Sequence, residues 1–391
     1  VSDSTRVLGD GNVTPPGGMG VMEGKSFLMK YLGGCDSNAI CMDSRNEKGE
    51  NDPDIIIDFV KRIQHSFGAI NLEDISQPNC YKVLDTLREE CDIPVWHDDQ
   101  QGTACVILAG LFNSLELAGK TIDKVRIVFN GAGSANTANA RLIMAAGADP
   151  KKIVMFDIDG PLDETRDDFK NDPRYYAHWK ICQKTNPNKY KTVQEALSGA
   201  DVLISCSKPG PGVIKKEWIE KMNDKSIVFA CANPVPEIYP YEAKEAGAFI
   251  VGTGRGDFPN QINNSLCFPG ILKGTLLVRA SKITDEMAIA SAKAIAEYSK
   301  KKGINPDQVI CKMDDIDVYP YEAAEVAMEA IKCGVAREEK TWDEVFDKVK
   351  KDIQLVHEMM KTMIDNGWIK KIPEKMLKDS LDWAISQIET K

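Results

Sequence analysis

The stretch Val125-Arg-Ile-Val-Phe-Asn-Gly-Ala-Gly-Ser-Ala-Asn136 decides the fold of this 391-residue chain. Residues 125–130 form an apolar, β-branched run that predicts a strand, and two glycines after it predict a tight turn. A helical pattern follows through Met144, and a second apolar run ends in Asp157, about twenty residues after the turn. Strand, glycine turn, helix, strand and acid in this order are typical of a Rossmann unit.

The glycine turn predicts a dinucleotide site, since backbone can approach a pyrophosphate there at a helix N-terminus. The residues expected around it are Gly131, Ala132, Gly133, Ser134, Ala135 and Asn136. Asp157 would accept hydrogen bonds from ribose hydroxyls, which favours NAD, and Asp159 adds negative charge where a 2′-phosphate would lie. A basic residue from another loop, such as Lys208, could still accommodate NADP. We expect Asn136, at a position normally held by Gly or Ala, to crowd the helix–strand packing and weaken cofactor binding.

The chain on either side of this motif predicts an α/β fold in three regions. Apolar runs at 202–205, 226–230 and 249–252 alternate with helical patterns at 193–197, 215–222 and 241–246, which indicates a doubly wound parallel sheet over residues 103–282. A smaller α/β domain over residues 1–102 and a helical region over residues 283–391 are expected beside it. An apolar stripe from Phe346 to Met363 predicts a helix that packs on its own domain, with a subunit contact as the alternative.

Two acidic clusters mark the first region. Asn71-Leu-Glu-Asp74 and Trp96-His-Asp-Asp-Gln-Gln-Gly-Thr103 each follow a short apolar run, and a helical pattern at 80–90 separates them. Strand, helix and parallel strand would bring both clusters to neighbouring strand ends. Like charges at such a place are tolerated when they hold a metal or share protons, whereas solvated loop acids are the alternative.

Residues 5–25 are rich in glycine and proline and predict a loop, with a helix from about Lys25 through Tyr31. Lys25 could be an ordinary surface lysine or could lie near the acids. Asn233 and the pair Asn263–Asn264 follow predicted strands, and their amides suit carboxylate, hydroxyl or carboxamide ligands. Taken singly, each could instead be a turn residue, and for Asn233, which precedes Pro234, that is the better interpretation.

Bulk properties limit the possible partners. The net charge of −10 argues against nucleic acid or an anionic membrane, and no uninterrupted apolar run approaches a membrane span. The eleven cysteines are scattered in mostly apolar contexts and the four histidines are dispersed, which favours a reducing, cytoplasmic location and argues against a histidine-based zinc site.

These motifs together resemble those of the malic enzymes, in their shorter, prokaryote-like form. The matching stretches run in order between Arg6 and Arg337: Val21–Lys25, Gly68–Asp74, His97–Ala104, Asn130–Gly133, Ala232–Glu237, Thr253–Asn264 and Phe268–Ile271. The resemblance implies oxidation of L-malate with NAD or NADP and decarboxylation to pyruvate and CO₂, with Mg²⁺ or Mn²⁺, by a homodimer.

The resemblance also implies roles for single residues. Glu73, Asp74 and Asp99 would bind the metal, which agrees with the preference of hard cations for oxygen ligands. Lys25 would be the general base for the C2 hydroxyl, with a pKa lowered by burial or by the cation, and Asp98 its orienting partner. Arg6 would hold a malate carboxylate, and Asn233, Asn263 and Asn264 would line the malate and nicotinamide pocket.

One departure from the family pattern leaves other functions open. The family's general acid is a tyrosine in a motif upstream of everything in this chain, so we expect a missing N-terminal segment or poor decarboxylation. A malolactic reaction that releases lactate and a non-catalytic nucleotide-binding paralogue are the alternatives.

Overall fold

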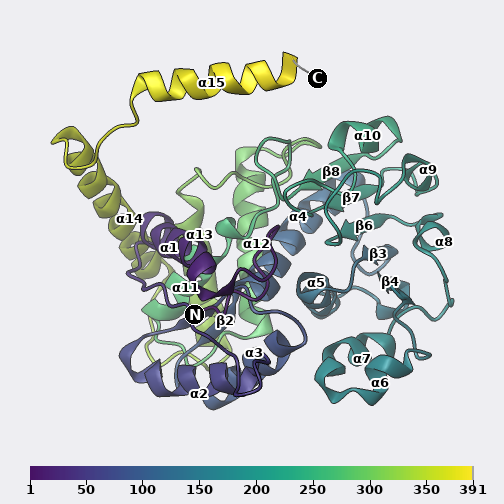
Figure 1. The fold of residues 1–391 in the computed structure, drawn as a ribbon, viewed down its shortest axis with the longest axis horizontal. Coiled ribbons are helices and arrows are strands. Elements are labelled where there is room, and N and C mark those ends of the chain that lie inside the picture. Colours follow the sequence, from purple (N-terminus) through teal and green to yellow (C-terminus); the bar gives the residue numbers. More distant parts are fainter. Residues whose placement is uncertain (390–391) are drawn as a thin grey trace.

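The larger sheet of the computed structural model has six strands in the order β5-β4-β3-β6-β7-β8 and lies on the right in Figure 1; the structure describes residues 1–389. Its strands are β3 (Ile127–Asn130), β4 (Ile153–Asp157), β5 (Gly160–Pro161), β6 (Val202–Ser205), β7 (Ile227–Ala230) and β8 (Ile250–Thr253). All neighbouring strands are parallel except β4 and β5. The predicted Rossmann-type sheet is therefore confirmed.

Alternation along β3 divides its side chains between two apolar layers. Ile127 and Phe129 belong to one buried cluster and Val128 to the other. The first layer includes α4 (Thr103–Ala118), α5 (Ser134–Ala145) and α12 (Asp285–Lys302), and the second includes α8 (Val193–Leu197), α9 (Lys216–Ile219) and α10 (Pro240–Glu245). Each fully buried side chain of this size contributes about 1.5–3 kcal/mol, so the doubly wound packing stabilises the fold strongly.

The segment Asp98–Ala118 is long and apolar enough to cross a membrane by length and composition alone. Because 78% of its most apolar window is buried inside the molecule, α4 is accounted for as a core helix of this fold.

The first region holds a separate two-stranded sheet. Strands β1 (Ile70–Leu72) and β2 (Val95–His97) are parallel, with Leu72 opposite His97, and α3 (Asn79–Glu90) connects them. Helices α2 (Pro53–Ile63) and α3 bury Val60, Leu84 and Leu87 in their own apolar cluster. The predicted strand–helix–strand arrangement is confirmed, and it places both acidic clusters at one edge.

Helix α1 spans Thr14–Gly33, so the prediction of a loop through residue 25 was wrong. Two prolines stand in the first turn of the helix, where the N–H that proline lacks would have no partner within the helix. Gly18 is required inside it because a Cβ there would lie 1.9 Å from Ser4 Oγ. The glycines therefore permit close packing of a helix, which local propensity does not reveal.

The helices after the large sheet pack mainly on the rest of the molecule. Helices α11 (Phe268–Leu277), α13 (Val318–Lys332) and α14 (Trp342–Asp365) join the main core, and Val349 and Ile353 of the predicted α14 stripe are buried there. Short helices α6 (Asp167–Asn171) and α7 (Tyr176–Cys182) lie beside β4 and α5. The last helix, α15 (Glu374–Glu389), falls within the predicted helical region 283–391 but lies apart from the body (Figure 1).

Candidate active site

The cofactor and substrate residues predicted from the sequence, except Asn136, line two adjoining cavities at the carboxyl ends of the large sheet. A cavity of about 500 Å³ is lined by Arg6, Asp99, Gly133, Ser134, Ala135, Asn233, Asn263 and Asn264. A second cavity of about 820 Å³ contains Gly131, Ala132 and Asp157 and shares Arg6 and Gly133 with the first. Open α/β sheets bind their ligands at this edge.

The three predicted metal ligands meet beside the first cavity, which Asp99 lines. One carboxylate oxygen from each of Glu73, Asp74 and Asp99 lies within 4.8 Å of the others. The backbone of Asp74 has a positive φ of 57°, and its N–H donates to Asp99 Oδ2 at 2.7 Å. Asp74 Oδ2 is buried without a hydrogen-bond partner, which is costly unless a cation or a proton takes its place. An all-oxygen set with one unpartnered oxygen fits Mg²⁺ or Mn²⁺.

Burial makes these carboxylates hard to ionise together. Burial raises the pKa of Glu73 to about 7, although Lys25 opposes the shift. The pKa of Asp74 is also raised, first by burial and then by the charges of Asp99 and Glu73. This arrangement is stable only when positive charge or protons offset the acids.

Lys25, on the inner face of α1, supplies one such positive charge. Its ammonium contacts Asp98 Oδ2 directly and lies 3.2 Å from Glu73 Oε1. Burial alone would lower the pKa of Lys25, but the carboxylates of Asp98, Glu73 and Asp99 outweigh it, so this pKa lies above the usual lysine range. The expected pairing with Asp98 is present. The expected lowering of the pKa is absent because the surrounding acids hold the proton.

Asp98 is fully buried at the start of a five-residue π-turn, η2 (Asp98–Gly102). Burial raises the pKa of Asp98 to about 7, against the opposing charge of Lys25. A Cβ at position 102 would lie 1.9 Å from Asp98 Oδ1, so only glycine leaves room for this carboxylate. A buried acid with a raised pKa beside a lysine can exchange protons with it near neutral pH.

Asn136 is buried and fully hydrogen-bonded, so the prediction that it crowds the helix–strand packing was wrong. Its Nδ2 donates to the carbonyls of Gly131 at 2.8 Å and Asn130 at 3.1 Å, and its Oδ1 accepts from Asn139 at 3.0 Å. Asn136 therefore stabilises the glycine turn through hydrogen bonds to its carbonyls. Its effect on cofactor affinity stays a prediction.

Glu237 is a second buried residue that holds the cofactor loops together, although the sequence predicted no role for it. Its Oε1 accepts from Ser205 Oγ at 2.7 Å and from Ser207 N at 2.8 Å, and its Oε2 accepts from Ala232 N at 3.0 Å. The carboxylate thereby joins the loops that follow β6 and β7. An acid three residues after Asn233-Pro234 is the signal that the sequence offers, whereas the burial of Glu237 is seen only in the structure.

Asp157 lies at the end of β4 as predicted, but it is paired. Arg166 Nη1 and Nη2 donate to its two oxygens at 2.8 and 2.6 Å, and Arg166 also contacts Asp168 at 2.7 Å. The guanidinium lies 4.2 Å from the centroid of the Phe169 ring. The basic group nearest the predicted ribose site is thus Arg166, nine residues after Asp157 in the chain, and no pattern in the sequence singled it out. Lys208 lines the same cavity.

The predicted substrate residues lie around one cavity, and they differ in how tightly their side chains are held. Arg6 is exposed, and its backbone N–H donates to the Asp74 carbonyl at 2.9 Å, which joins it to the metal cluster. Asn263 Oδ1 accepts from Ser265 N at 2.9 Å and so begins the short helix η5 (Asn264–Leu266). Asn233 packs against Gly254, where a Cβ would lie 2.9 Å from its Nδ2. Among residues 1–389, no tyrosine lines the cavity that holds these groups.

A glycine turn on a Rossmann sheet opens to a cavity lined by Asp99, and the pair of Lys25 and buried Asp98 lies next to that acid. These features are typical of a dinucleotide-dependent oxidoreductase. Two family models match: "Malic enzyme, N-terminal domain" over residues 1–88 and "Malic enzyme, NAD binding domain" over residues 100–333. The chain belongs to the malic enzyme family, whose members are NAD(P)-dependent decarboxylating oxidoreductases.

Individual relatives agree with this placement. The chain is 42% identical to a bifunctional malic/malolactic enzyme of Bacillus subtilis, over 90% of this chain and 82% of that one. It is 38% identical to an NADP-dependent malic enzyme of Halomonas elongata, over 86% and 80% of the two chains. A crystal structure of Entamoeba histolytica malic enzyme superimposes with a TM-score of 0.97 at 63% identity, covering 99% of this chain and 80% of that chain.

Proposed function

We propose that this chain oxidises L-malate at C2 with NAD or NADP and decarboxylates the product to pyruvate and CO₂, using Mg²⁺ or Mn²⁺. The observation that carries the proposal is the contact of Lys25 with Asp98 and Glu73, beside the carboxylates of Asp74 and Asp99. Malic enzyme relatives over most of the chain support malate as the substrate.

Four residues would bind and orient malate. Arg6 presents a guanidinium at the cavity mouth for one malate carboxylate, because its side chain makes no ion pair within residues 1–389. Asn233, Asn263 and Asn264 surround the opposite side with amides that donate to carboxylate or carboxamide oxygens. Together they would fix C2 toward Lys25 and leave the cofactor side open.

Lys25 would accept the proton of the C2 hydroxyl at Nζ. It must first lose a proton, and Asp98 Oδ2 is the acceptor in direct contact. Asp98 thus positions Lys25 and stores its proton, and a pKa near neutrality suits that task. Glu73, Asp74 and Asp99 would hold the cation. When bound, the cation polarises the hydroxyl and carboxylate oxygens of malate, and NAD(P) accepts the hydride.

Steady-state formation of NAD(P)H from L-malate with Mn²⁺ tests the proposal. Lys25→Ala should reduce kcat by about 10²–10⁴, the range typical of a lost general base. The dissociation constant for the dinucleotide should stay unchanged, because Lys25 does not line the cofactor cavity. Lys30→Ala is the matched control: Lys30 lies on the same helix and pairs with exposed Asp36. Full activity of Lys25→Ala would overturn the assignment of the base.

A malolactic outcome is the second candidate, because the Bacillus subtilis relative is named for both reactions. The two reactions differ in their products. In the malolactic reaction the bound NADH reduces pyruvate to lactate and is itself returned to NAD, whereas the malic enzyme reaction releases pyruvate and NADH. Analysis of the products after complete conversion of malate distinguishes them, and lactate without net NADH would favour the malolactic reaction.

The choice between NAD and NADP would depend on Asp157 and Arg166. A free Asp157 carboxylate favours ribose hydroxyls and hence NAD, as the sequence suggested, whereas an Arg166 guanidinium favours a 2′-phosphate. In the structure the two side chains form a salt bridge, so the charge of each offsets the charge of the other. Arg166→Ala should therefore raise the KM for NADP more than the KM for NAD, and Asp157→Ala should do the reverse.

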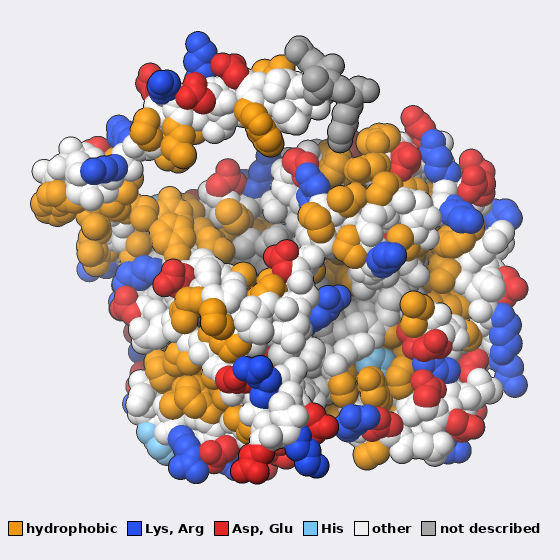
Figure 2. Space-filling view, in the orientation of Figure 1, with side chains coloured by type: hydrophobic (Ala, Val, Ile, Leu, Met, Phe, Trp, Pro, Cys, Tyr) orange, Lys and Arg blue, Asp and Glu red, His pale blue; other side chains and the backbone are white. Residues whose placement is uncertain are grey.

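We also propose a cytoplasmic homodimer. The cysteines, all reduced, support a reducing compartment. Support for the dimer comes from α14 and α15, whose exposed apolar residues include Leu355, Met359, Leu381 and Trp383. Figure 2 shows apolar side chains of α15 facing the hollow beside the body. Light scattering should give twice the chain mass, and Trp383→Glu should shift it toward the monomer while Lys378→Glu on the same helix should not.

A further inference from the structure

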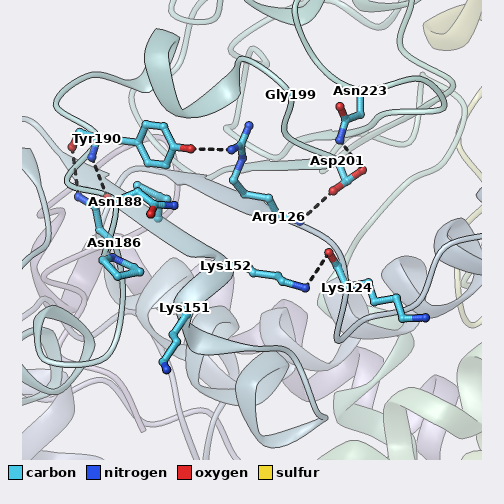
Figure 3. A pocket seen from close by; sticks show the side chains of 12 residues that line it. Lys124, Arg126, Lys151, Lys152, Asn186, Asn188, Tyr190, Gly199, Asp201 and Asn223 are labelled. Atoms are coloured by element: carbon cyan, nitrogen blue, oxygen red, sulfur yellow. Dashed lines mark hydrogen bonds between the residues drawn. The ribbon is translucent and has the colours of Figure 1, made fainter.

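A cavity of about 300 Å³ opens at the end of the large sheet opposite the glycine turn. Its walls come from the segments that lead into three neighbouring strands: Lys124 and Arg126 before β3, Lys151 and Lys152 before β4, and Asp201 before β6. The loop 186–190 closes one side with Asn188 and Tyr190 (Figure 3). None of these residues lines the proposed active site.

The lining carries four basic side chains and one acid, in a chain with a net charge of −10. Asp201 is already engaged, because it accepts from Lys120 Nζ at 2.9 Å, Asn223 Nδ2 at 3.0 Å and Arg126 N at 2.9 Å. Lys152 Nζ donates only to the carbonyls of Asp123 and Lys124, at 3.1 and 3.2 Å. Lys152 forms no salt bridge with any residue in the range 1–389, and the exposed Asp123 carboxylate offsets its charge only in part.

The rim of the cavity adds further positive charge. Lys124 and Lys151 are exposed there and form no salt bridge with any residue in the described range 1–389. Asp123 and Asp149 lie outside the lining: Asp123 interacts with Lys124 and Lys152 from the exposed surface, and Asp149 caps the turn that begins at Pro150. The cavity is thus a basic site within an acidic molecule, and its field attracts anions.

Tyr190 provides a hydrogen-bond donor inside the cavity. Arg126 Nη1 donates to Tyr190 Oη at 2.6 Å, as Figure 3 shows, so the hydroxyl keeps its own proton for another acceptor. The backbone of Tyr190 is held by Asn186, whose Nδ2 donates to the Tyr190 carbonyl at 3.1 Å and whose Oδ1 accepts from the Tyr190 N–H at 2.9 Å. Arg126 Nε is buried without a partner. A rigid donor beside fixed positive charge suits a phosphate or carboxylate oxygen.

We propose that this cavity binds a small anion with at least two negative charges, carried on phosphate or carboxylate groups. Its volume lies at the lower end of small-molecule sites, which is room for a compact metabolite and too little for a dinucleotide. Lys124, Lys151 and Lys152 supply the charge, and Tyr190 with Arg126 supplies a directional contact.

Isothermal titration with pyrophosphate and with citrate tests the proposal. Saturating NADH without divalent metal keeps both probes from the cofactor cavity and from complexation. We expect saturable binding to the intact chain and at least a tenfold weakening in Lys124→Gln/Lys151→Gln. The control Lys293→Gln/Lys312→Gln removes the same charge from exposed lysines elsewhere and should bind like the intact chain. Tyr190→Phe should weaken binding several-fold.

The pattern of results decides the ligand class and the proposal itself. Binding of pyrophosphate alone supports a phosphate ligand, binding of citrate alone supports a polycarboxylate, and binding of both supports recognition by charge. No saturable heat from either probe would overturn the proposal, as would equal affinities in the two double variants. Circular dichroism at matched temperature verifies that each variant is folded, which is expected because the substituted lysines are exposed.

Discussion

Asn136→Ala tests whether this residue braces the glycine turn or disturbs it. The substitution removes two donated hydrogen bonds, at 2.8 Å to the Gly131 carbonyl and 3.1 Å to the Asn130 carbonyl, and one accepted from Asn139 at 3.0 Å. At about 1 kcal/mol each, the free energy of unfolding should fall by about 2–3 kcal/mol. Asn139→Ala removes only the third of these bonds and should cost about 1 kcal/mol.

The same loss should appear in cofactor binding. The dinucleotide would have to order a turn that Asn136 no longer holds, and a cost of about 1 kcal/mol corresponds to a roughly fivefold weaker dissociation constant. Urea unfolding followed by circular dichroism gives the stability change, and titration of NADH fluorescence gives the affinity. An unchanged unfolding free energy together with unchanged or tighter NADH binding in Asn136→Gly would refute the bracing role and restore the crowding interpretation.

Three further perturbations follow from other parts of the structure. Asp74→Asn removes a charge from the proposed cation site, so calorimetry should show at least tenfold weaker Mn²⁺ binding while NADH affinity is retained. Gly18→Ala should destabilise the fold by about 1–3 kcal/mol because its Cβ meets Ser4, whereas Gly20→Ala, with open space around it, should stabilise α1 by about 0.5–1 kcal/mol; both are measured by urea unfolding. Burial raises the pKa of Glu322 well above 4.5, so the folded state keeps a proton that the unfolded chain loses. The contribution of this group to the free energy of unfolding is full below pH 4.5 and falls as pH rises. Glutamine does not ionise, so the free energy of unfolding of Glu322→Gln should rise relative to that of the native protein by up to about 1.4 kcal/mol per pH unit between pH 5 and 7.

The strands of both sheets could be predicted from the sequence because the pattern that marks a strand is local. Apolar runs such as Ile127–Asn130 and Ile153–Asp157 end at turn residues, and parallel connection then follows from general rules of chain topology. The acid cluster was predictable for the same reason: it follows β1 and precedes α4 on neighbouring strands.

What could not be predicted depends on contacts between distant segments. Gly18 reads as a helix breaker until Ser4 is seen against it, and Arg166 reads as a surface residue until it meets Asp157. The raised pKa of Lys25 likewise depends on the burial of Asp98 and Glu73 around it, which residue spacing does not report. Patterns in the chain predict elements, whereas the charge state of a site is set by three-dimensional neighbours.

The acidic cluster therefore depends on residues that carry no charge. The π-turn brings Asp98 and Gly102 into contact. Asp98 can be fully buried beside Lys25 only because Gly102 has no Cβ to fill the space of its carboxylate. Asp74 and Asp99 are joined through a backbone N–H, which requires the positive φ at Asp74. An acid-rich sequence without this glycine and this backbone would place its carboxylates in solvent, where they would neither pair with lysine nor converge. Glycine and backbone geometry, as much as the four acids, determine that this edge of the molecule is a site.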